Sequence, residues 1–167
     1  WRYAISKNLE HRLMLTDYGG FDQAFGKVAA MRNSLIVVTD LGMDEPAMNQ
    51  AMPLLSQAVS QGCRIVWLDH HLWEPAAIKS LLSLENNPIL KVNPDYCAAE
   101  ITQKVLMPRD IISQEIATIA HDTDFNLREI EAASALTDAV SVIRFSALDK
   151  REDITDALTP IVEALAK

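Results

Sequence analysis

Three consecutive residues, Asp69, His70 and His71, bring a carboxylate and two imidazoles together directly after the apolar run Ile65–Leu68. Carboxylates and imidazoles are the ligands expected for manganese, magnesium, iron or zinc, and carboxylate-rich sites favour manganese or magnesium. Turn formation does not explain two adjacent histidines behind a strand, because His has no turn preference that would place them there. The triplet therefore predicts a metal site.

A second apolar run, Leu35–Val38, passes through Thr39 into Asp40. Ligands of open parallel sheets bind beyond the carboxyl ends of the strands, so Asp40 and the triplet are expected on one rim. A carboxylate such as Asp40 could bridge two metal ions about 3.5–4 Å apart, which together hold the attacking and leaving oxygens of a phosphoryl transfer. Alone, an Asp after a strand is more often a cap or turn residue.

A third cluster of potential ligands, His121-Asp122-Thr123-Asp124-Phe125, closes the apolar stretch Ile111–Ala120. It is the best candidate for a further contribution to the same rim, although sequence alone does not place it there. His121 either orients Asp122 or packs at a helix end. Trp67 and Trp73, which flank the triplet, are interpreted as core and wall side chains.

The elements that position these residues alternate between short strands and longer helices. Strand-length apolar runs occur at Leu13–Leu15, Leu35–Val38, Arg64–Leu68 and Ile89–Val92. Helices are expected from the Asp44 cap to about Ser60, from Pro75 to near Glu85, and from behind Asp95 to before Pro108. Three more follow, at about 110–120, 126–146 and 153–166. This order predicts an α/β fold with a mainly parallel, doubly wound sheet flanked by helices, followed by an all-helical C-terminal segment.

Composition narrows the class of protein. The chain has 167 residues, with 15 Lys and Arg against 23 Asp and Glu, a formal charge of −8. That charge disfavours a general electrostatic grip on nucleic acid, and a phosphate substrate needs bound cations to reverse it locally. No apolar run reaches membrane-spanning length. Cys63 and Cys97 lack metal-type spacing and are expected to be buried free thiols in a reducing cytoplasm.

Taken together, three motifs resemble those of the DHH phosphoesterases, a superfamily of single-strand exonucleases of the RecJ type, oligoribonucleases, nucleotide phosphatases, cyclic-dinucleotide phosphodiesterases and pyrophosphatases. The resemblance covers roughly Leu13 to Asn126. Its motifs are Val37-Val38-Thr39-Asp40-Leu41-Gly42, then Leu68-Asp69-His70-His71, then Asp122-Thr123 followed closely by Phe125.

The resemblance implies a hydrolase of phosphodiester or phosphoanhydride bonds that acts through water activated by two Mn²⁺ ions, with Mg²⁺ as the other candidate metal. By motif position, Asp40, His70 and Asp122 would bind metal, and His71 would contact the substrate phosphate. Asp69 would orient the histidines from behind. Short oligonucleotides or nucleotides are favoured over pyrophosphate as substrates. A cytoplasmic location, no membrane partner and a homodimer complete the expectation.

The family's first motif, an Asp-x-Asp at the end of the first strand, has no counterpart here. Asp17 and Asp22 bracket a glycine pair and read as a loop. We therefore expect the first strand to lie upstream of Trp1. Residues 1–148 would form the phosphoesterase domain, and 149–167 a C-terminal helix or linker towards an absent second domain.

Two alternatives remain. One is a catalytically inactive DHH-like scaffold that binds nucleic acid or a partner protein, which would explain the missing motif without truncation. The other is a helical HD-type phosphohydrolase centred on His121 and Asp122. The strands that end at Asp40 and Asp69 argue against it.

Overall fold

The computed structural model describes residues 1–16 and 20–167, so the predicted loop residue Asp17 lies outside the described part. The chain divides into two compact units, and each is described by itself. The sheet unit comprises residues 17–101, and the helical unit comprises residues 1–16 and 102–167. The boundary between them falls inside α5 (Ala98–Leu106).

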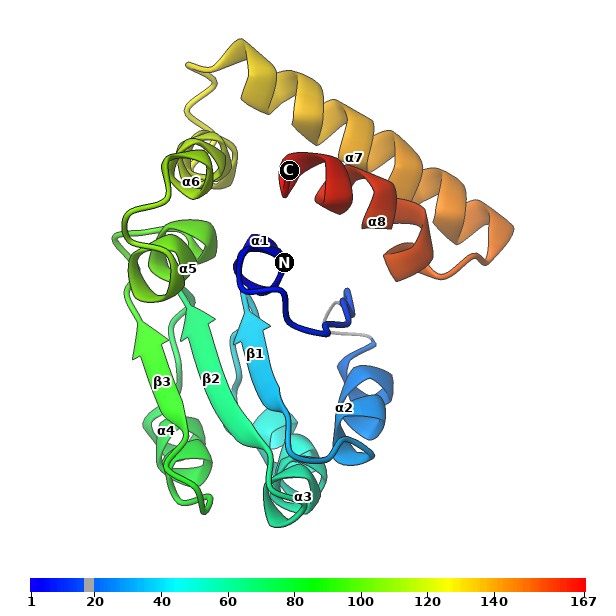
Figure 1. Cartoon of the computed structure of the whole chain (residues 1–167). Coiled ribbons are helices and arrows are strands. Elements are labelled where there is room, and N and C mark those ends of the chain that lie inside the picture. Colours follow the sequence, from blue (N-terminus) through cyan, green and yellow to red (C-terminus); the bar gives the residue numbers. More distant parts are fainter. Residues whose placement is uncertain (17–19) are drawn as a thin grey trace. The chain divides into compact units, whose positions relative to one another are not determined.

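The sheet unit contains three parallel strands in the order β1-β2-β3 (Figure 1). These are β1 (Leu35–Thr39), β2 (Arg64–Asp69) and β3 (Ile89–Val92). Thr39 is in register with Leu68, and Asp69 with Val92, so the carboxyl ends of all three strands meet at one edge. The predicted parallel strands are confirmed, and this shared edge is where the candidate ligands begin.

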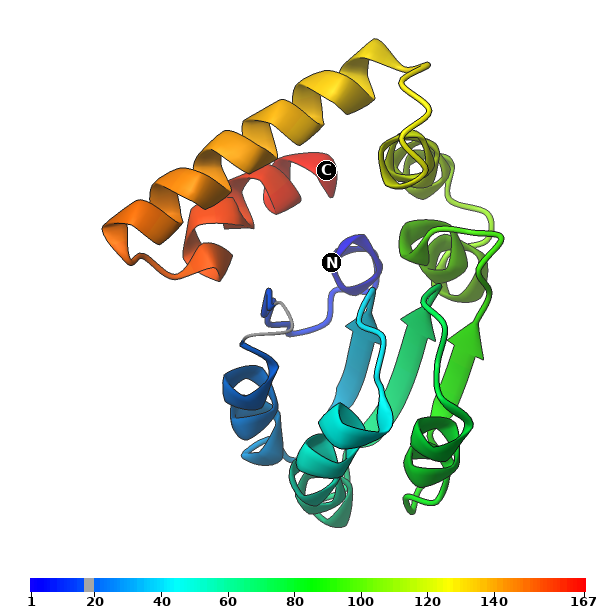
Figure 2. The ribbon, with the colours of Figure 1, turned by 180° about the vertical axis from the view of Figure 1, so that it is seen from behind.

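Two crossover helices connect the strands, α3 (Glu45–Ser60) and α4 (Pro75–Leu82). Both lie on the same face of the sheet, as the two opposite views show (Figures 1 and 2). Right-handed crossovers between strands laid down in one direction place their helices on one side. A third helix, α2 (Phe21–Ala29), packs against α3.

Local sequence explains where α3 begins and ends. The Asp44 carboxylate accepts a hydrogen bond from the Ala47 N–H at 2.7 Å, which confirms the predicted cap. Pro53 does not split the helix, which runs on to Ser60. Gly62 follows it with a φ of 86°, a left-handed conformation that suits glycine and does not continue the helix.

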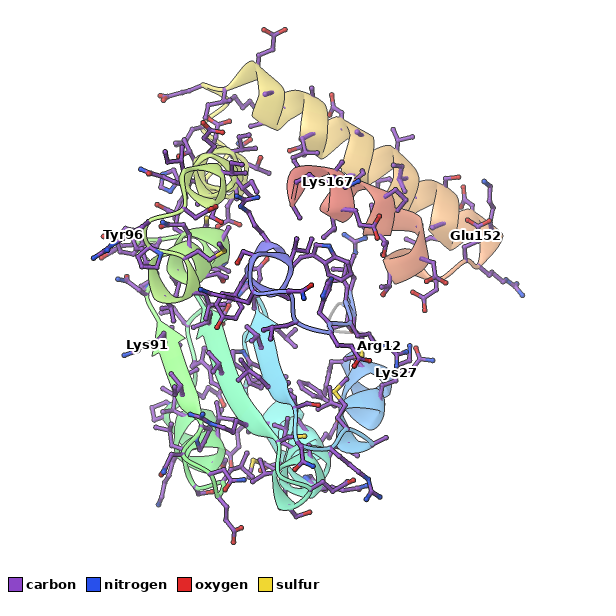
Figure 3. The ribbon with its side chains drawn as sticks, in the orientation of Figure 1. Arg12, Lys27, Lys91, Tyr96, Glu152 and Lys167 are labelled. Atoms are coloured by element: carbon purple, nitrogen blue, oxygen red, sulfur yellow. The ribbon has the colours of Figure 1, made fainter. Side chains whose placement is uncertain are left out.

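The core of the sheet unit centres on β2, whose last five residues are all buried. The Trp67 indole lies between Phe25 and Trp73, with ring centroids 5.8 Å and 5.1 Å away. Apolar side chains from the helices complete this core, among them Met48, Leu55, Ala58, Ala77 and Leu81. Figure 3 shows side chains filling the space between sheet and helices, with Lys27 and Lys91 labelled on the outside. A strand buried on both faces gives its final residues a rigid support.

The helical unit contains α1 (Arg2–Ser6), α6 (Ile111–Asp124), α7 (Glu131–Lys150) and α8 (Ile154–Leu165). Helices α7 and α8 pack against each other and are joined by a short turn that carries Glu152 (Figure 3). Arg2 donates two hydrogen bonds to the Asp110 carboxylate, at 2.6 and 2.9 Å, and a third to the Ala166 carbonyl. These contacts join the first helix to the start of α6 and the end of α8. The expected division of the chain near residue 148 stays a prediction.

The structure corrects the predicted strand at Leu13–Leu15, which is an irregular segment. The Leu15 N–H donates to the Thr155 hydroxyl at 3.0 Å, a side chain 140 positions away. Three apolar residues between polar neighbours predicted the strand, but the backbone finds its partner on α8. Apolar content over so short a run does not distinguish a strand from an extended connection.

The predicted helix at 126–146 also begins later than expected, at Glu131. Asn126 and Arg128 both have left-handed backbones, with φ of 52° and 60°. The Glu129 N–H donates to the Asp122 carboxylate at 2.8 Å. These conformations keep residues 126–130 out of the predicted helix.

Other expectations concern the class of protein. None of the helices in the described residues is long and apolar enough to cross a membrane. Cys63 and Cys97 are buried and are not joined in a disulfide, as predicted. The fold is therefore mixed α/β, with a parallel sheet flanked by helices and a helical C-terminal region.

Candidate metal centre

Asp40 leaves the end of β1 in an unusual backbone conformation. Its φ is 58°, in the left-handed region that non-glycine residues other than Asn and Asp seldom adopt. The Asp40 N–H still donates to the Leu68 carbonyl at 3.2 Å, which ties this residue to the end of β2. The side chain remains 58% exposed. The chain thus turns sharply while keeping the carboxylate at the edge of the sheet.

Asp69 is the last residue of β2, and its side chain is completely buried. One carboxylate oxygen, Oδ1, lies 2.8 Å from Nδ1 of His71. The other, Oδ2, accepts a hydrogen bond from the Trp73 indole N–H at 2.7 Å. A buried carboxylate needs such donors, because removing it from water otherwise carries a large penalty. Asp69 therefore faces the protein interior and supports His71 from behind.

The structure brings four of the predicted residues together. One potential ligand atom from each of Asp40, Asp69, His70 and His71 lies within 4.8 Å of all the others. His70 Nε2 is 3.2 Å from Asp40 Oδ1, and the two histidine rings have centroids 4.4 Å apart. The predicted meeting of the two strand ends is confirmed. Two imidazoles and a carboxylate at this spacing, with a second carboxylate behind them, could hold a metal ion.

Sequence reasoning missed the polar roles of the two tryptophans. Trp67 and Trp73 are buried, as core and wall side chains should be. Each indole also donates a hydrogen bond within the site, from Trp73 to Asp69 and from Trp67 to the Leu41 carbonyl at 2.8 Å. A buried indole N–H usually finds an acceptor, and the nearest polar groups in sequence were those of the two motifs. This general behaviour of buried indoles was the signal from which a hydrogen bond of each tryptophan could have been expected.

The loop between the Asp69–His71 triplet and α4 is also fixed at its C-terminal end, at Glu74. The Glu74 carboxylate accepts a hydrogen bond from the Glu45 N–H at 2.7 Å, in the first turn of α3. The segment from His70 to Glu74 is thus fastened to β2 through Trp73 and to α3 through Glu74. Its histidines are carried by a loop with two fixed points.

Asp122 belongs to the helical unit, in the last turn of α6. It is buried, and its Oδ1 accepts a hydrogen bond from the Glu129 N–H at 2.8 Å. Its carbonyl accepts another from the Leu127 N–H. These bonds hold the loop between α6 and α7. His121 stacks on Phe125, with ring centroids 4.6 Å apart. The role of Asp122 as a metal ligand stays a prediction.

Comparison with protein-family models found no match to this chain, and neither the curated proteins nor the solved structures gave a significant match. The candidate site is a compact Asp and His cluster at the carboxyl edge of a parallel sheet.

Proposed function

We propose that the chain carries the metal centre of a hydrolase that cleaves phosphodiester or phosphoanhydride bonds, in short oligonucleotides or nucleotides. The observation that supports this most is the convergence of Asp40, His70 and His71 within 4.8 Å, with buried Asp69 behind them. The motif resemblance to DHH phosphoesterases favours the same reading. The doubly wound sheet that the order of strands and helices predicted is kept as part of the proposal.

The donor set fits a divalent cation. The Asp40 carboxylate and the His70 imidazole lie 3.2 Å apart, a separation at which two groups can share one ion. Asp69 fixes the orientation of the His71 ring, and the other ring nitrogen of His71 could bind the same ion as a further ligand. In the proposal Asp40 and His70 would hold Mn²⁺, or alternatively Mg²⁺, with Asp122 as the further ligand that the motif resemblance implies. When bound, the metal would supply Lewis acidity and activate water for attack on phosphorus.

The protein residues contribute binding and orientation. Asp40 and His70 would hold the cation at the strand ends. The motif resemblance also implies that His71, 38% exposed at its side chain, contacts the substrate phosphate, and it could donate to a phosphate oxygen when its ring carries a proton on Nε2 as well as on Nδ1. Because the formal charge of the chain is −8, a bound cation would supply the positive charge that an anionic substrate needs at the site. Long-range attraction of nucleic acid is not part of the proposal.

The test compares the wild-type chain with His70→Ala. Mn²⁺ binding is measured by isothermal titration calorimetry, and hydrolysis of a dinucleotide, phosphoadenosine phosphate and pyrophosphate is measured with Mn²⁺. His70→Ala should remove both Mn²⁺ binding and hydrolysis. The loss of Mn²⁺ affinity should exceed about 10–100-fold, which is the loss typical when a residue that only orients a metal ligand is replaced. Its circular dichroism and melting temperature should match the wild type, because the ring lies at the edge of the fold.

Two results would contradict the proposal. Hydrolysis that survives His70→Ala would place the chemistry elsewhere. Metal binding without hydrolysis of any of the three substrates would favour the inactive scaffold. The specific observation behind that second candidate is that the chain's one Asp-x-Asp, Asp122-Thr123-Asp124, closes α6 and does not follow a strand.

A further inference from the structure

The Asp69 carboxylate sits between two ring N–H groups and has no exposure to solvent. The Trp73 indole can only donate, so its 2.7 Å contact makes Oδ2 an acceptor. The 2.8 Å contact at Oδ1 then requires a proton on His71 Nδ1. In the neutral ring this leaves the lone pair on Nε2. The hydrogen bonds thus select one tautomer of His71.

Trp73 is itself held in place. Its ring meets Trp67 edge-on, with centroids 5.1 Å apart and planes at 90°. Trp67 is fully buried, and its own N–H donates to the carbonyl of Leu41, the residue after Asp40. Glu74, the next residue after Trp73, is fixed to the start of α3. An indole with these contacts has little freedom to rotate, so it can hold a carboxylate in one orientation.

We propose that Trp73 is a positioning residue of the metal centre: through Asp69 it fixes the orientation of the His71 ring and the nitrogen that carries its proton. The inference rests on the metal centre proposed above. Partners behind metal-binding histidines commonly set tautomer and ring orientation in this way, and their loss costs about 10–100-fold in metal affinity. Here the effect passes through one further residue, from indole to carboxylate to imidazole.

The main experiment reads the tautomer without metal. Long-range ¹H–¹⁵N correlation spectra of the full chain at pH 8 report which ring nitrogen of each of its four histidines is protonated. The wild type should show His71 protonated at Nδ1. Trp73→Phe, which keeps the ring packing and removes the N–H, should shift His71 towards the Nε2-protonated form. Trp67→Phe is the matched control, because it removes the other indole N–H and leaves the contacts of Asp69 in place.

A second measurement tests the consequence for metal. Trp73→Phe should weaken Mn²⁺ binding by about 10–100-fold, and by more than Trp67→Phe does. A double-mutant cycle separates positioning from general damage: in a His71→Ala background, Trp73→Phe should cause little further loss. Equal and additive losses from both tryptophan variants would make Trp73 merely structural and would overturn the proposal.

If Trp73→Phe does not fold, the ¹H–¹⁵N spectrum of the wild type alone still tests the proposal. A His71 ring protonated at Nε2 in the wild type overturns the inference, and protonation at Nδ1 supports it. An unchanged tautomer in a folded Trp73→Phe variant also overturns it. By contrast, a chain that shows the expected tautomers but binds no Mn²⁺ contradicts the proposed function and leaves the positioning role of Trp73 intact.

Discussion

Two buried carboxylates, one in each unit, face very different partners. Among the described residues, Asp69 and Asp122 are the charged side chains that are buried, with 0% and 4% exposure. Asp69 accepts from two side-chain rings, Trp73 and His71. Asp122 accepts from a backbone N–H, that of Glu129.

The difference shows how a buried charge can be kept for function or for structure. A ring partner such as His71 has chemistry of its own, so the carboxylate that holds it influences a site. A backbone partner fixes the path of a loop. On this comparison Asp69 is tied directly to the candidate metal centre, while the hydrogen bond of Asp122 explains the turn between α6 and α7. Both residues were candidates from sequence, and their contacts separate them.

The largest effect is expected for Asp69→Asn. The amide keeps one acceptor oxygen but turns an NH₂ towards one of two donors, so one buried hydrogen bond is lost. The free energy of unfolding should fall by about 1–3 kcal/mol. Mn²⁺ affinity should fall with it, by about 10–100-fold. Urea denaturation and calorimetric titration measure the two losses. Full retention of both would break the comparison, because Asp69 would then not control His71.

Asp122→Asn is the matched change in the other unit and should cost less stability. Its amide oxygen can still accept from the Glu129 N–H, so the free energy of unfolding should change by less than about 1 kcal/mol. Asp122→Ala, which removes the acceptor, should cost about 1–3 kcal/mol.

Mn²⁺ titration of Asp122→Asn sharpens the comparison. If Asp122 is a metal ligand, as the motif resemblance implies, replacing the carboxylate should weaken Mn²⁺ binding while the stability stays near that of the wild type. Unchanged affinity would remove Asp122 from the ligand set and leave it a purely structural carboxylate.

The smallest effect is expected at a third carboxylate, Asp110, which is partly exposed. Hydrogen bonds from Arg2, and then from Ser113, hold the pKa of Asp110 well below its usual range. The lowered pKa means that the pair stabilises the fold above about pH 4, the ordinary Asp value. The contribution is lost as the pH falls through the lowered pKa of the folded state.

Asp110→Asn should therefore reduce the melting temperature slightly at pH 7 and should make it depend less on pH below about 4. Melting curves between pH 7 and pH 2 for both proteins check this. The reduction should also shrink in high salt, because exposed ion pairs are screened. Parallel pH profiles for the two proteins would show that the pair does not stabilise the helical unit.

Most of the elements could be predicted because their signals are local. The strands that end at Asp40 and Asp69 are apolar runs of strand length, and Asp44 with Pro46 marks a helix start. The errors came where local pattern was weak. Leu13–Leu15 is too short to distinguish a strand, and the left-handed residues after Phe125 leave no sign in apolar periodicity.

The candidate site was predictable to a similar extent. Strand order placed Asp40 beside the triplet, since consecutive strands joined by a crossover usually neighbour each other. Which acceptor each tryptophan N–H would find was not predictable. Nothing in the sequence specifies that Trp73 reaches Asp69 or that Trp67 reaches Leu41. Those contacts depend on how two rings pack in the core.

The sequence by itself determined the strand ends, the helix caps and the residue types of a metal centre, because apolar periodicity and capping act over a few neighbouring residues. Only the tertiary structure decided which groups donate hydrogen bonds to each carboxylate. Arg2 and Asp110 are 108 positions apart, and Leu15 and Thr155 are 140 apart. Such partners meet because the segments of one unit bury their apolar faces together, and that packing sets the final direction of each polar side chain.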